Sequence, residues 1–178
     1  MRAVDSSLLT WDDWALADAE RVWRYAGMCA FESTQGCTHF DGVETQNCID
    51  CIFFNLVEFV NTFTSKVFYD DFGACDSEAW LRIAGLAVAA CEGIDIDSVV
   101  NLLCSKQRDY GPNNILKFGH KGIAVRLSDK ISRLQTLRQR QSWFVPESAY
   151  DSFVDIVGYC IIALMLISGT FHLQMSQT

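Results

Sequence analysis

The sequence has almost no proline: only two of its 178 residues. Because proline interrupts helices, its scarcity leaves long helices free to form. The sequence also lacks paired segments of alternating apolar and polar residues, internal repeats and low-complexity tracts. Apolar residues instead recur at helical spacing, over residues 5–27, 47–68, 76–91, 99–103, 123–134 and from Pro146 onward. We therefore predict an all-α fold, a helical bundle, in which Asp5 or Thr10 caps the first helix and Asp76 or Ser77 the third.

Basic residues are few, with 14 Lys and Arg against 22 Asp and Glu, a net charge of -8. Binding to duplex nucleic acid needs clustered Lys and Arg on the phosphates, so we expect no such partner. A small nucleotide that carries Mg²⁺ is compatible with this balance, because the metal offsets local carboxylate charge.

No signal peptide is visible, because Met1–Asp5 leads into no apolar core with a small-residue cleavage site. We expect a cytoplasmic protein whose eight cysteines are reduced. The strongly apolar part of the last helix, Ile156–Ile167, is too short to cross a bilayer. We therefore predict no membrane contact, and a helix buried in the bundle or in a dimer.

Four side chains of the types that bind zinc lie close in the sequence: Cys37, His39, Cys48 and Cys51. Their spacing is not that of a standard zinc finger. Cys51 also opens an apolar helix, where a buried thiol is ordinary. We expect structural thiols here rather than a zinc site.

A turn-rich polar stretch, Lys106–Gly119, precedes a helix that carries Arg126, Asp129, Lys130 and Arg133 on one face. We predict a loop for this stretch. Taken alone, the charged face of the helix is explained by solvent exposure and internal ion pairs, each worth roughly 0.2–0.5 kcal/mol.

The last helix carries Glu147, Asp151 and Asp155 at intervals of four residues, with Tyr159 on the same face. Like charges at this spacing repel one another. The helix N-terminus stabilises the negative charge of Glu147, whereas apolar residues surround Asp155. Asp155 therefore needs a cation, either Mg²⁺ or a basic side chain from the facing helix, and the sequence leaves both open.

Four blocks of these residues, in order, resemble the nucleotide modification associated domain 1 family of phage and bacterial proteins, over about residues 98–167. The blocks are Arg108–Gly111; Asn114–Leu116 with Phe118–Gly119; Val125–Lys130 with Arg133–Leu134; and Glu147 with Asp151, Asp155 and Gly158–Tyr159. That family is similar to the MazG-like all-α nucleotide pyrophosphohydrolases. The resemblance implies a dimer or tetramer that binds a nucleotide with Mg²⁺, located in the bacterial host cytoplasm if phage-encoded. Residues 96–178 would form this domain, and residues 1–95 a helical extension on the same core.

MazG-like enzymes hold Mg²⁺ with pairs of acids on two adjacent helices. This chain departs from that pattern, because its first charged helix offers only Asp129 and its second spaces the acids by four. We expect a Mg²⁺-dependent pyrophosphohydrolase that converts a nucleoside or deoxynucleoside triphosphate to monophosphate and pyrophosphate. The alternative is a protein that binds a nucleotide, a second messenger or a host protein without catalysis.

Each of these residues then has an expected role. The predicted ligands of Mg²⁺, or of Mn²⁺ in its place, are Asp129, Glu147, Asp151 and Asp155. The predicted catalytic residues are Asp129, Lys130, Asp151 and Asp155. The predicted nucleotide-binding residues are Lys106, Arg108, Tyr110, Asn114, Arg126, Arg133 and Tyr159, of which Tyr110 and Asn114 would contact the base or sugar.

Overall fold

The computed structural model of the chain describes residues 9–34, 49–69, 76–139 and 146–176. These ranges contain six α-helices, one short 3₁₀ helix and no strand, which confirms the prediction of an all-α fold. The helices are α1 (Trp11–Thr34), α2 (Ile49–Tyr69), α3 (Ser77–Ala90), α4 (Ile96–Tyr110), α5 (Asn113–Gln139), α6 (Pro146–Ser168) and η3 (Thr170–His172).

Polar side chains fix the starts of the helices. The Asp76 carboxylate accepts a hydrogen bond from the backbone at the start of α3, and Asp95 does the same for α4. At α1, Thr10 and Asp13 exchange hydrogen bonds between side chains and backbone N–H groups. The predicted caps at Thr10 and Asp76 are therefore confirmed, whereas Asp5 lies outside the described residues.

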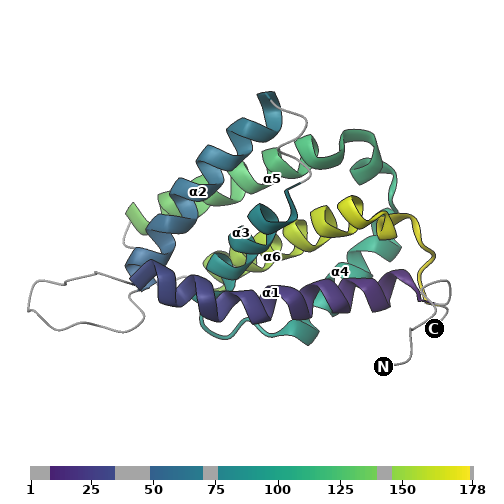
Figure 1. The fold of residues 1–178 in the computed structure, drawn as a ribbon, viewed down its shortest axis with the longest axis horizontal. Helices are drawn as coiled ribbons and strands as arrows, with labels where there is room; N and C mark the ends of the chain where they lie inside the picture. Colours follow the sequence, from purple (N-terminus) through teal and green to yellow (C-terminus); the bar gives the residue numbers. More distant parts are fainter. Residues whose placement is uncertain (1–8, 35–48, 70–75, 140–145, 177–178) are drawn as a thin grey trace, which may run out of the picture.

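The helices surround one hydrophobic core (Figure 1). Helices α3 and α6 lie in the middle, with α1 on one side and α2 and α5 on the other. The contact between α1 and α3 is close at Gly85, where a Cβ atom would lie 3.0 Å from the Cys29 sulfur and 3.3 Å from the Ala26 backbone. The ends of the described chain meet, because the Trp11 N–H donates to the Gln174 carbonyl over 2.9 Å.

Helix α6 contains a longer apolar stretch than the sequence analysis expected. Ala149–Ser168 is long and apolar enough to cross a membrane by length and composition alone. However, 67% of this stretch is buried inside the fold. Phe153, Val157 and Ala163 are among its buried side chains. The prediction of a buried bundle helix is therefore confirmed.

Two predicted boundaries are wrong. Helix α1 continues past residue 27 to Thr34, because no residue of this extension breaks a helix. The predicted loop over 106–119 is largely helical, since Lys106 and Gln107 are good helix formers and α4 runs to Tyr110. Helix α4 ends at Gly111, with φ of 65°, followed by Pro112, and a second non-helical residue, Gly119, lies within α5.

The cysteines in the described residues are free thiols, as expected: Cys29, Cys51, Cys91, Cys104 and Cys160. Three of them are buried, and burial raises the pKa of the Cys29 thiol to about 11. Of the zinc-type cluster, Cys51 lies half-buried on α2, while Cys37, His39 and Cys48 lie outside the described residues.

Candidate functional site

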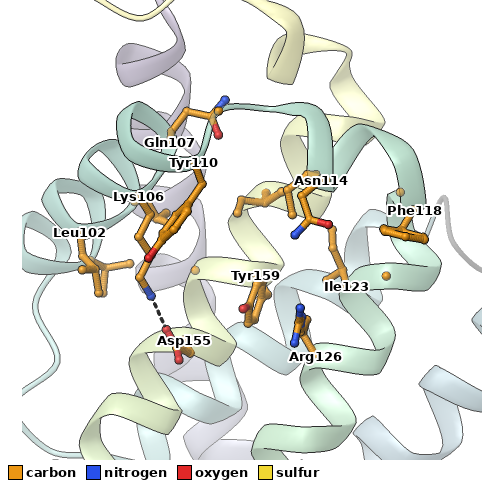
Figure 2. A pocket seen from close by; sticks show the side chains of 18 of the residues that line it. Leu102, Lys106, Gln107, Tyr110, Asn114, Phe118, Ile123, Arg126, Asp155 and Tyr159 are labelled. Carbon is orange, nitrogen blue, oxygen red and sulfur yellow. Dashed lines mark hydrogen bonds and ion pairs between the residues drawn. The ribbon is translucent and has the colours of Figure 1, made fainter.

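Helices α4, α5 and α6, with one residue of α1, enclose a cavity of about 660 Å³. In Figure 2 the labelled side chains of α4 lie on one side of this cavity and those of α5 on the other, with Asp155 and Tyr159 of α6 between them. The volume falls in the range of roughly 300–1,000 Å³ that is usual for small-molecule sites. The cavity is therefore large enough for a ligand of nucleotide size.

Two glycines shape the wall that α5 contributes. Gly111 ends α4, and Gly119 interrupts α5 with φ of 53° and ψ of -144°. The segment between them places Asn114 and Phe118 in the wall. Phe118 lies so close to Gly122 that a Cβ atom there would approach the Phe118 Cβ to 2.6 Å. Glycine at these positions lets the start of α5 bend over the cavity.

Most of the wall is apolar, and two aromatic rings lie at its exposed edge. Tyr110 is 79% exposed and Phe118 is 56% exposed. Leu103 and Ile123 are buried deeper in the wall. An exposed aromatic ring beside an apolar surface suits a planar ligand that stacks on it.

Asp155 is the acid of the cavity wall, and it is held between two lysines. Its Oδ1 accepts a hydrogen bond from Lys106 Nζ at 2.7 Å, and its Oδ2 lies 2.6 Å from Lys130 Nζ. Burial raises the pKa of this carboxyl, but the hydrogen bonds and charges of the two lysines outweigh burial and hold the pKa below its usual value. Asp155 is therefore ionised, and the lysines supply the cation that the sequence pattern required.

The structure brings together six of the predicted site residues in the cavity wall: Lys106, Tyr110, Asn114, Arg126, Asp155 and Tyr159. Lys130 stands behind Asp155. Arg108 lies outside the wall, where its guanidinium pairs with Asp12 over 3.0 Å.

The remaining predicted residues are not in the wall. Asp129, Arg133 and Asp151 are exposed, and none of them lines the cavity. Glu147 lies in the first turn of α6, but its side chain is outside the described residues.

These carboxylates do not form a magnesium site within the described part of the chain. Mg²⁺ requires a near-octahedral shell of oxygen ligands at about 2.0–2.1 Å. No group of three or more His, Cys, Asp or Glu side chains that could hold a metal occurs in residues 9–34, 49–69, 76–139 and 149–176. Both oxygens of Asp155 already face an ammonium group. The magnesium assignment stays a prediction that these residues do not fit.

Three further residues of the wall, Gln107, Phe118 and Trp11, had no predicted role in binding. Gln107 and Phe118 lay within the segments already singled out, and only the fold shows that they face the cavity. Trp11 comes from α1, far away in the sequence, and no sequence signal marked it. Trp11 is fully buried, and its Nε1 has no hydrogen-bond partner among the described residues.

No curated protein and no solved structure matches the chain. A family model does match, over residues 106–167. This segment runs from the end of α4 through nearly all of α6, and it supplies seventeen of the twenty-one described residues that line the cavity. The resemblance found in the sequence is thus confirmed: residues 106–167 match the family described as nucleotide modification associated domain 1.

Proposed function

We propose that the cavity between α4, α5 and α6 binds a nucleotide. One observation carries this proposal: the family segment and the cavity coincide, and the cavity combines an apolar, aromatic wall with basic side chains. A nucleotide has the matching division into a flat base and an anionic phosphate. These features support a nucleotide as the ligand of this cavity.

The base would lie against the exposed rings of Tyr110 and Phe118. Stacking of a base on an aromatic side chain contributes about 1–3 kcal/mol. Asn114 lies in the same wall, and its amide can both donate and accept hydrogen bonds. This pair of interactions, stacking and an amide, suits a base edge.

The phosphate would lie against Lys106 and Arg126, the two basic side chains of the wall among the described residues. Arg126 is exposed on α5 and donates to no acceptor among the described residues, so its planar guanidinium can take a phosphate through two parallel hydrogen bonds. Lys106 offers a further donor, since one ammonium group carries three N–H bonds and the bond to Asp155 uses one.

A thermal-shift panel tests the proposal directly. Purified protein is heated with each of the eight common ribonucleotides and deoxyribonucleotides as mono- and triphosphates, with and without Mg²⁺. Ligand that binds only the folded state raises the unfolding temperature, by an amount that grows with concentration above Kd. If no nucleotide shifts the transition at any concentration, the proposal is wrong.

A pair of arginine variants connects binding to the cavity. Loss of a hydrogen bond to a charged group costs about 1.5–3 kcal/mol, so Arg126→Ala is expected to weaken binding by about tenfold or more. Arg24→Ala removes an exposed arginine of α1 that does not line the cavity, and should leave the affinity unchanged. Equal effects of the two substitutions would place the ligand elsewhere.

A second candidate is the pyrophosphohydrolase reaction. In favour of it, the ionised carboxylate of Asp155 lies in the cavity wall. Water would attack the α-phosphorus, and the bond from this phosphorus to the bridging oxygen of the β-phosphate would break. The products would be monophosphate and pyrophosphate. Chromatography of each binding mixture decides: product that disappears in Asp155→Asn supports hydrolysis, whereas binding without product over hours supports a binding protein.

A further inference from the structure

The two lysines on Asp155 occupy the positions at which a carboxylate would meet a metal ion. Each oxygen of Asp155 has an ammonium nitrogen within 2.7 Å. A divalent cation at this carboxylate would have to compete with both ammonium groups, and among the described residues no second acid lines the cavity to help hold it. The positive charge that a phosphate needs here is already supplied by side chains.

The amount of that charge selects the ligand. Lys106, Arg126 and Asp155 line the cavity, and Lys130, which is not in the wall, pairs with Asp155. Together these four side chains carry two net positive charges. A phosphate monoester carries about -1.5 to -2 near pH 7, which matches this value. A triphosphate carries more negative charge, which proteins usually offset with Mg²⁺ bound to the phosphates.

We infer that the cavity takes a nucleoside monophosphate without a divalent cation, with its phosphate on Lys106 and Arg126. This inference rests on the proposed nucleotide-binding function and names the ligand class. Lys130 has a supporting part. By pairing with one oxygen of Asp155, it prevents the carboxylate from neutralising Lys106 completely, so that Lys106 keeps charge for the phosphate.

Isothermal titration of the full chain separates the possibilities. Each nucleoside monophosphate and its triphosphate is titrated twice, once in EDTA and once in Mg²⁺, with the parent nucleoside as a third ligand. The monophosphate should bind equally well in both buffers, within about twofold. It should bind at least about tenfold more tightly than the nucleoside and than the triphosphate in EDTA.

The outcomes are distinguishable. Monophosphate binding that requires Mg²⁺, or tighter binding of a triphosphate with Mg²⁺, overturns the inference and leaves the proposed function standing. Equal affinity for the nucleoside and the monophosphate also overturns the inference. Failure of every nucleotide to bind overturns the proposed function itself, and the inference with it.

The Asp155→Asn variant tests the role of this carboxylate directly, because it keeps the side-chain shape and removes the negative charge beside the phosphate. Loss of a nearby like charge should tighten monophosphate binding in EDTA, by up to about tenfold. A metal-ligand role for Asp155 predicts the opposite, a loss of binding. Asp97→Asn, an exposed residue of α4 outside the cavity, is the matched control.

A second variant tests the inference even if Asp155→Asn does not fold. Lys106→Ala removes a phosphate donor and leaves Asp155 paired with Lys130. Monophosphate affinity should fall about tenfold or more, while nucleoside affinity stays unchanged. If Lys106→Ala binds the monophosphate like the unmodified protein, the phosphate does not lie on Lys106 and the inference is wrong.

Discussion

The bend at Gly119 offers a test of how the cavity is built. Gly119 has φ of 53° and ψ of -144°, a conformation that is nearly restricted to glycine. An alanine there would meet no neighbouring atom within 4 Å, so the backbone conformation is the main source of strain. Holding a side-chain-bearing residue in such a conformation costs about 1–3 kcal/mol. We therefore expect Gly119→Ala to destabilise the fold by this amount.

Gly27 provides the matched control. It also has open space for a Cβ atom, but it lies in the exposed interior of α1 and has no positive φ. Alanine is favoured over glycine by roughly 0.5–1 kcal/mol in a helix. Gly27→Ala should therefore stabilise the protein, whereas Gly119→Ala should destabilise it, although both substitutions add the same methyl group.

Thermal unfolding followed by circular dichroism measures both effects. For a domain of 150–250 residues, 1 kcal/mol shifts Tm by roughly 2–4 °C. Gly119→Ala should lower Tm by about 2–12 °C, and Gly27→Ala should raise it by up to about 4 °C. Nucleotide affinity should fall only in Gly119→Ala, because Asn114 and Phe118 precede the bend. Stabilisation by Gly119→Ala would refute the bend described here.

Three further predictions concern single contacts. Gly122→Ala should displace the Phe118 ring, because the new Cβ atom would lie 2.6 Å from the Phe118 Cβ, and weaker nucleotide binding by titration would show it. Asp76→Ala should lower the free energy of unfolding by about 0.5–2 kcal/mol in urea, because it removes the N-cap of α3. The folded-state pKa of Asp155 is depressed, so its contribution to stability is present above the unfolded value of 3.8 and is lost as pH falls through the folded pKa. The Asp155→Asn variant has no carboxyl group at this position, so its unfolding temperature should fall less as the pH is lowered. A fall equal to that of the unmodified protein would contradict this role of Asp155.

The helical class of the fold could be predicted from the sequence, because apolar periodicity reports which face of a helix is buried. The path between α4 and α5 could not be predicted in detail. Gly111 and Gly119 suggested one long loop, yet each changes the chain direction at a single residue. The polar residues between them carry helix-compatible propensities, and tertiary packing decides that they are helical.

Part of the cavity wall could also be predicted from the helical spacing of the residues. Arg126 and Asp155 stood out because charge recurs at helical spacing beside apolar stripes, and both line the cavity. The pairing of Lys130 with Asp155 followed the expectation of a basic side chain on the facing helix. Trp11 could not be found in this way, because its place in the wall depends on how α1 packs against distant helices. The predicted dimer or tetramer stays a prediction.

A crystal structure of the protein with the nucleotide that gives the largest thermal shift is the most direct test of nucleotide binding in this cavity. We expect the base to lie beside Tyr110 and Phe118 and the phosphate to contact Lys106 and Arg126, within the cavity of the family segment. A nucleotide bound on any other surface, with this cavity filled only by solvent, would contradict it.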